Sequence, residues 1–339
     1  MIFKLKIPNI KMKMIAALAG VLILTGCLNA QLIPNLGGQR TGTASFQFLK
    51  IGTNARGTGM GETVVAVSDD ISALNYNPAG IVLFNENGVT FTHTQWFVDT
   101  RIENAAGVYH FGSNALGLSV TSLRTEDMKV TTEYQHEGTG DYFRFSDLAI
   151  GLTFARKMTD QFSFGATVRY VEEALGVLKM RTVVGDLATY YKTGLGTSRF
   201  AVMITNFGGQ VSPKGTVQKV GGGELSDFQS FPPPTVFRVG FAFEPWMNEK
   251  NRLTTSIQLN SPNDNKENFS IGAEYAYKDF FVVRSGYKFN VDAESYSGGI
   301  GLKFPITFAK GSLDYSIANF KELGFAHRIT LSLLFPSKH

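Results

Sequence analysis

The chain has 339 residues and a formal net charge of +4, with 36 glycines, 28 phenylalanines and 12 tyrosines. A single cysteine excludes a disulfide framework and a clustered-thiol metal site, and the scattered Lys and Arg residues exclude a nucleic-acid footprint. Charged residues make up 18% of the chain, below the usual quarter, which is typical of a protein whose apolar surface is not all folded inward.

The N-terminus has the features of a secretory signal. Lys4, Lys6, Lys11 and Lys13 precede the apolar run Met14 to Leu24, and small residues follow it. This run is too short to span a bilayer as a helix, which needs roughly 20 apolar residues. We therefore predict a signal peptide at residues 1–30 and export of the mature chain.

Two processing routes are open at the end of this signal. The stretch "LTGC" resembles a bacterial lipobox, in which Cys27 would be acylated and become the new N-terminus. The alternative is ordinary cleavage after Ala30, although Leu28 is bulky where a small residue is preferred.

Residues 31–85 differ from the rest of the chain. They are polar and dense in glycine, with one short apolar run at Val64 to Val67. The stretch "RGTGMG" invites a nucleotide-loop interpretation, but no buried strand of a βαβ unit precedes it and no Gly-Lys-Ser/Thr follows. We expect no nucleotide or other cofactor.

From residue 86 onward the dominant pattern is alternation with period two. Phe162, Phe164, Val168 and Tyr170 share one parity, and polar or small residues occupy the other. The segments are longer than the five or six residues usual in a soluble sandwich, and tilted strands of this length cross a bilayer. We predict fourteen strands, near residues 86–97, 99–111, 115–124, 144–157, 161–173, 178–192, 197–207, 234–246, 251–260, 267–278, 280–290, 296–309, 311–320 and 324–335.

The connections support the same architecture. Two long ones, near residues 125–143 and 208–233, both follow odd-numbered strands, and the connections after even-numbered strands are short. This asymmetry is typical of outer-membrane barrels, which have short periplasmic turns and longer extracellular loops. The fold prediction is an all-β, fourteen-stranded antiparallel transmembrane β-barrel over residues 86–336, surrounded by outer-membrane lipid.

The stretch from "FLKIG" through "NARGTGMGE" to "VAVSDDISALNYNPAG", residues 48–80, resembles the N-terminal region of the PorV/PorQ family, which is itself similar to the FadL-like barrels. The resemblance implies that residues 31–85 form a lead and a hatch folded into the lumen. The expected hatch motif consists of Gly57, Gly59, Gly61, Asp69, Asp70, Asn77, Pro78, Ala79 and Gly80.

Each part of this motif has an expected role. The first three glycines would let the backbone approach the barrel wall. Asn77 to Gly80 would form the turn toward the first strand: Pro78 presets φ, Asn77 bonds the backbone beyond it, and Gly80 takes a conformation closed to other residues. Asp69 and Asp70 would bond to Arg or Lys of the lumen; the alternative is an acid/base or cation-binding pair.

The sequence offers no catalytic or metal site. The five histidines show no zinc-ligand spacing, and no Gly-x-Ser-x-Gly elbow occurs. We therefore expect a protein that is not an enzyme. The family resemblance implies capture and handover of secreted cargo, through its C-terminal signal domain, to other type IX secretion components at the outer membrane. The alternative is a FadL-like transporter with a hydrophobic small molecule in the lumen.

Overall fold

A computed structural model describes residues 41–219 and 222–336. The predicted signal peptide (residues 1–30), Cys27 and residues 31–40 of the predicted lead lie outside the described residues. The division into signal, hatch and barrel at residues 30 and 85 therefore stays a prediction.

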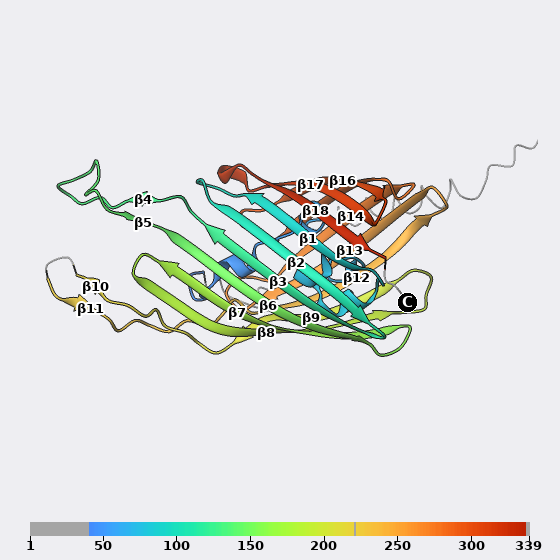
Figure 1. Ribbon diagram of the computed structural model, residues 1–339, viewed down its shortest axis with the longest axis horizontal. Coiled ribbons are helices and arrows are strands. Elements are labelled where there is room, and N and C mark those ends of the chain that lie inside the picture. Colours follow the sequence, from blue (N-terminus) through green and yellow to red (C-terminus); the bar gives the residue numbers. More distant parts are fainter. Residues whose placement is uncertain (1–40, 220–221, 337–339) are drawn as a thin grey trace, which may run out of the picture. The chain divides into compact units, whose positions relative to one another are not determined.

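Fourteen antiparallel strands close into a barrel in which chain order is spatial order (Figure 1). The first strand pairs with the last in continuous register, with Phe91 opposite Leu331. The fold prediction is confirmed. The barrel strands are β1 Asn87–Gln95, β2 Arg101–Phe111, β3 Asn114–Arg124, β6 Phe145–Lys157, β7 Phe162–Leu175, β8 Leu178–Lys192, β9 Arg199–Gly208, β12 Val236–Met247, β13 Asn251–Pro262, β14 Asn268–Tyr277, β15 Phe281–Phe289, β16 Tyr296–Ile306, β17 Ala309–Asn319 and β18 Phe325–Phe335.

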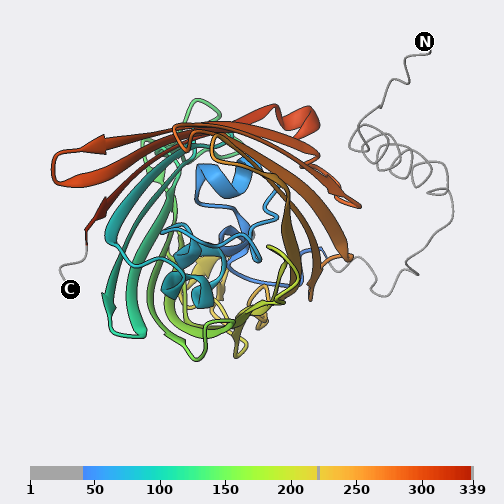
Figure 2. The ribbon, with the colours of Figure 1, turned by 90° about the vertical axis from the view of Figure 1, so that its right-hand side faces the viewer.

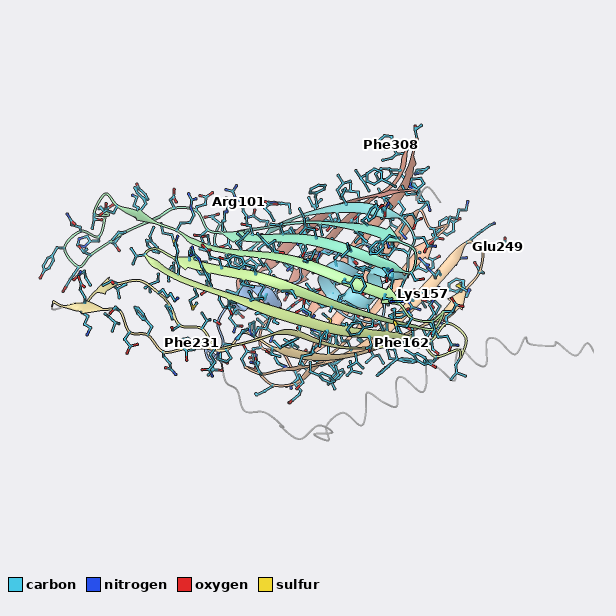
Figure 3. All side chains as sticks on the ribbon, turned by 60° about the horizontal axis from the view of Figure 1, so that its bottom comes forward. Arg101, Lys157, Phe162, Phe231, Glu249 and Phe308 are labelled. Atoms are coloured by element: carbon cyan, nitrogen blue, oxygen red, sulfur yellow. The ribbon has the colours of Figure 1, made fainter. Side chains whose placement is uncertain are left out.

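The two faces of the wall follow the sequence alternation. In β7, Ser163 and Thr167 are buried against the lumen, whereas Val168 is 60% exposed on the outside. Large apolar side chains cover the outer face of the other strands in the same way (Figure 3). A soluble protein would hide such a surface, and a transmembrane barrel turns it toward acyl chains.

The two ends of the barrel differ. Connections of a few residues join the strands at one end, here called the short-turn end, where Asn87 of β1 lies opposite Phe335 of β18. The other end, here called the long-loop end, carries the connections 125–144 and 209–235 (Figure 1). Each contains a two-stranded ribbon, β4 Met128–Lys129 with β5 Tyr142–Phe143, and β10 Val217–Gln218 with β11 Glu224–Leu225.

Residues 41–86 form a luminal segment, whose short helices lie inside the ring of strands (Figure 2). They are η1 Gln47–Lys50, α2 Ala55–Gly59, α3 Ala73–Tyr76 and η2 Pro78–Val82; η3 Lys321–Leu323 lies in the connection before β18. None of the helices in the described ranges has the length and hydropathy needed to cross a membrane.

A charge on the outer face of the wall tests its contact with lipid. We expect Leu118→Arg, in the middle of β3, to lower the free energy of unfolding in lipid vesicles by about 2–4 kcal/mol, because the guanidinium would lie in hydrocarbon. Leu323→Arg, on the equally exposed η3, serves as the control and should leave unfolding in urea unchanged. Equal effects of the two substitutions would contradict the membrane orientation.

Candidate functional site

The luminal segment runs through the barrel from the long-loop end to the short-turn end. The backbone N–H of Ser45 donates to the Pro232 carbonyl of the second long connection at 3.0 Å. The Lys50 ammonium and the Gln47 amide both reach the Asp264 carboxylate, in the connection between β13 and β14, at 2.7 Å. The segment ends where β1 begins, at the opposite end.

The turn at residues 77–80 fastens the segment to the wall. Asn77 is fully buried; its Oδ1 accepts the Ala79 N–H at 2.9 Å and its Nδ2 donates to the Val65 carbonyl at 2.7 Å. Pro78 occupies the first turn of η2, where its missing N–H is not needed. The Ser163 hydroxyl of β7 donates to the Ala79 carbonyl at 2.8 Å.

One expectation for this turn is wrong. Gly80 lies in η2 without a positive φ, so it does not use the conformation that only glycine readily adopts. Glycine is required at position 80 because there is no room for a side chain: a Cβ there would lie 2.3 Å from the Ser68 carbonyl oxygen.

The three glycines of the hatch motif do not share one role. A Cβ at Gly59 would lie 3.2 Å from the Gly299 Cα, and one at Gly61, where φ is +63°, would lie 3.0 Å from the Tyr287 nitrogen. These two glycines face the wall. Gly57 instead packs on Tyr76 of the same segment, where a Cβ would lie 2.3 Å from the ring.

Glycines of the wall meet the luminal segment from the other side. A Cβ at Gly286 of β15 would lie 2.0 Å from the Gly61 nitrogen, and one at Gly165 of β7 would lie 2.3 Å from the Pro78 carbonyl carbon. Sequence reasoning missed both, because a glycine at an inward strand position carries no signal of which segment will lie against it.

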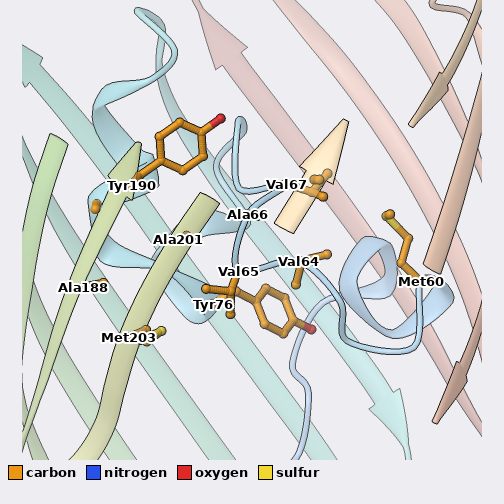
Figure 4. Packing of buried hydrophobic residues seen from close by; sticks show 12 residues of the cluster. Met60, Val64, Val65, Ala66, Val67, Tyr76, Ala188, Tyr190, Ala201 and Met203 are labelled. Carbon is orange, nitrogen blue, oxygen red and sulfur yellow. The ribbon is translucent and has the colours of Figure 1, made fainter. Parts of the chain in front are cut away.

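An apolar patch of the inner wall receives the run Val64 to Val67. This run packs against Ala188, Tyr190, Ala201 and Met203 of β8 and β9 (Figure 4). Burying a valine side chain contributes roughly 1.5–3 kcal/mol, so this contact stabilises the segment against the wall.

A buried charge network ties the segment to a second part of the wall, at β14. Arg56 of α2 forms two hydrogen bonds with Glu274 of β14, at 2.9 and 3.0 Å, and ion pairs with Asp69 and Asp70, each at 2.7 Å. Burial alone would lower the pKa of Arg56, but the carboxylates of Asp70, Glu274 and Asp69 outweigh burial and raise this pKa well above its ordinary value. Asp69 and Asp70 therefore pair with a buried arginine of the luminal segment itself. The expectation of an Arg or Lys of the lumen did not say which residue it would be.

The network continues along the wall. Arg284 of β15 donates to Glu274 at 2.7 Å and to Asp314 of β17 at 2.6 Å. Glu274 thus stands between two arginines, each of which has a second carboxylate. In the sequence, nothing distinguishes Glu274 from the other polar residues that alternate with apolar ones in the predicted strand near residues 267–278.

Two cavities open in the lumen beside η1. They have volumes of about 50 and 180 Å³, and Lys50, Glu62 and Arg238 line both. The rest of the lining of the larger cavity is mostly charged and amide side chains, whereas the smaller cavity is also lined by apolar residues such as Phe48, Ile51 and Met203. Within the described ranges, no group of three or more His, Cys, Asp or Glu residues is placed to hold a metal ion.

The fold and its filled lumen define the chain as an outer-membrane barrel of the kind seen in several solved transporters. The toluene transporter TbuX of Ralstonia pickettii is 16% identical, with 84% of this chain and 97% of that chain covered at a TM-score of 0.57. The toluene transporter TodX of Pseudomonas putida is 13% identical (82% and 96% covered, TM-score 0.55), and the monoaromatic hydrocarbon channel CymD is 15% identical (85% and 98% covered, TM-score 0.59). Likenesses at this identity establish the fold.

The family is established by sequence. The family model for the type IX secretion system protein PorV matches residues 35–262, about two thirds of the chain, and the chain belongs to this family. No significant match to a curated protein sequence was found.

A methyl group at Gly286 tests the contact between wall and segment. We expect Gly286→Ala to lower the free energy of unfolding by about 1–3 kcal/mol and to expose the luminal segment to added protease, since the new Cβ overlaps the Gly61 backbone. The control is Gly298→Ala, where the nearest atom lies 3.7 Å away and no loss is expected. If both variants resist protease like the parent, the close contact does not exist.

Glu274→Gln tests the charge network. We expect it to lower the free energy of unfolding by about 3 kcal/mol, because Arg56 and Arg284 lose their shared buried carboxylate. Glu172→Gln removes the partner of Arg181 in a solvent-exposed pair and should change the urea unfolding curve little. A parent-like curve for Glu274→Gln would show that the network contributes nothing to stability.

Proposed function

We propose that this PorV-family barrel binds secreted cargo at its long-loop end and hands it to other components of type IX secretion, without catalysis. The observation that carries the proposal is the contrast between the lumen and the long-loop end. The lumen is filled by the luminal segment, whereas two extended connections project from one end of the barrel (Figure 1). A rigid scaffold commonly presents its recognition residues on such loops.

The first connection, residues 125–144, has an ordered hairpin core. The Val130 N–H donates to the Asp141 carbonyl at 2.9 Å, and the Thr139 N–H donates to the Val130 carbonyl at 2.8 Å. Arg144 and Asp127 form an ion pair of 2.7 Å at its base. A hairpin that is already ordered before binding loses less conformational entropy on binding than an unstructured loop does.

The second connection, residues 209–235, is anchored to the barrel. Lys179 of β8 and Lys214 exchange both backbone hydrogen bonds, at 2.9 and 2.8 Å, and Val211 and Phe231 do the same within the connection. Its base is therefore an extension of the barrel wall.

Apolar side chains are exposed at this end. Tyr134 is 89% exposed and Tyr142 is 60% exposed, both in the first connection, and Val177 in the neighbouring turn is 66% exposed. These three are here called the rim residues. Exposed aromatic residues on a polar surround are typical of a protein-binding surface.

The lumen gives less support to transport of a hydrophobic molecule. The larger luminal cavity is lined mainly by charged and amide groups, which suit an aromatic hydrocarbon poorly. The smaller cavity has apolar residues such as Phe48 and Ile51 in its lining, but its volume of about 50 Å³ is well below the roughly 150 Å³ of a cavity that holds benzene. Irregular strand pairing, where a side opening for a hydrophobic molecule would be sought, occurs among the described barrel strands only between β8 and β9 and between β12 and β13. The toluene transporters TbuX and TodX share the fold of this chain, at 16% and 13% identity.

Substitution of the rim residues tests the proposal. We expect the triple variant Tyr134→Ser, Tyr142→Ser and Val177→Ser to bind a purified C-terminal signal domain of a secreted protein at least about tenfold more weakly, measured by surface plasmon resonance on the barrel in nanodiscs. The matched control, Met158→Ser with Leu195→Ser, removes exposed apolar residues from the short-turn end and should bind like the parent.

The same variants separate secretion from transport in cells. Cargo retained by the rim variant, with normal surface cargo in the control strain, supports the proposed function. Unchanged secretion in a strain lacking the gene, together with reduced uptake of labelled toluene, would contradict it.

A further inference from the structure

The larger luminal cavity, of about 180 Å³, is here called the vestibule. It lies just inside the long-loop end, because Asn265 and Val291 of two connections at that end contribute to its lining. Three cations and two carboxylates line it: Lys50, Arg238, Lys288, Glu62 and Glu294.

Arg238 stands out among these cations. Lys50 is paired with Asp264 at 2.7 Å, and Lys288 is paired with Glu294. Arg238 points inward from β12 and has no hydrogen bond or ion pair to any residue of the described ranges, and its Nε is buried. Arg238 is partly buried, and the carboxylates of Glu62 and Asp186 act on it only from beyond ion-pair distance. Burying a guanidinium N–H without an acceptor is destabilising, so the position of Arg238 requires an explanation other than stability.

A chain of amides beside Arg238 has a fixed direction. The Val65 N–H donates to Gln258 Oε1 at 3.1 Å, Gln258 Nε2 donates to Asn260 Oδ1 at 2.8 Å, and Asn260 Nδ2 donates to Asn268 Oδ1 at 2.9 Å. A backbone N–H can only donate, so every amide in the chain is oriented by the first bond. The last group, Asn268 Nδ2, is left as a donor without a hydrogen-bond partner among the residues that the structure describes.

The strand register places these two free donors near each other. Asn260 of β13 lies directly opposite Arg238 on β12 and directly opposite Asn268 on β14. Arg238 and Asn268 therefore flank one amide at the same level of the wall. Glu62 also lines the vestibule, but it forms no ion pair with Arg238, and its one side-chain hydrogen bond is a long one, 3.4 Å, from the Thr58 hydroxyl.

We propose that the vestibule binds a carboxylate group. Arg238 holds the two oxygens through its planar pair of N–H donors, and Asn268 donates a further hydrogen bond. A water molecule occupies roughly 30 Å³ in the liquid, so a cavity of about 180 Å³ has room for only a few groups of that size. This volume fits the end of a chain or a small acid. The source is either a free small acid or the C-terminal carboxylate of a polypeptide entering at the long-loop end. The site goes beyond the proposed function, because it depends on the vestibule and not on the rim residues.

Three probes test the site on the mature protein in detergent by isothermal titration calorimetry. N-acetyl-alanyl-alanine should bind, and its C-terminal amide should bind at least about tenfold more weakly, because the charge-assisted bonds are lost. Propionate identifies the source: its binding indicates that a small acid suffices, whereas binding of the peptide acid alone indicates a polypeptide end.

Variants keep the test independent of folding. Arg238→Gln should lose binding of the peptide acid without a lower melting temperature, since it removes an unpaired charge, and Arg252→Gln near the short-turn end should bind like the parent. Asn268→Asp places a carboxylate beside Arg238 and should both block binding and raise the melting temperature. Equal binding of acid and amide, or parent-like binding by Arg238→Gln, would overturn the proposal.

Discussion

The need to pair every backbone N–H and C=O inside a membrane governs this structure. Hydrocarbon offers no hydrogen-bond partners, so a sheet can cross it only when its first and last strands meet. Here β1 pairs with β18 along the whole length of β1. Once the ring is closed, the outer face must be apolar because it contacts lipid. The inner face is polar, and the lumen that it surrounds has to be filled.

The luminal segment fills the lumen and is held to the inner face by two different kinds of contact. The run Val64 to Val67 is buried against β8 and β9, and Arg56 is paired with Glu274 of β14. Glycine at positions such as Gly286 brings backbone against backbone where no side chain would fit. The segment is thus part of the core of the barrel.

The same segment also determines the electrostatics of the vestibule. The amide chain that ends at Asn268 starts at the Val65 N–H, which lies in the run buried against the wall. If that N–H were elsewhere, the amides could reverse and present acceptors. Packing of apolar residues against β8 and β9 therefore sets the hydrogen-bonding character of a cavity lined by the neighbouring strands β12 to β15.

The sequence by itself determined the barrel, the number of strands and the position of the two long connections, because an alternation with period two reports locally which side chains face lipid. It also pointed to Asn77 and Pro78 as a turn, since their chemistry acts on neighbouring backbone. Only the tertiary structure decided that Arg56 meets Glu274, that Gly61 meets Gly286, and that the luminal segment enters from the long-loop end. These contacts join residues at least 187 positions apart, and closure of the ring brings them together without leaving any local pattern in the sequence.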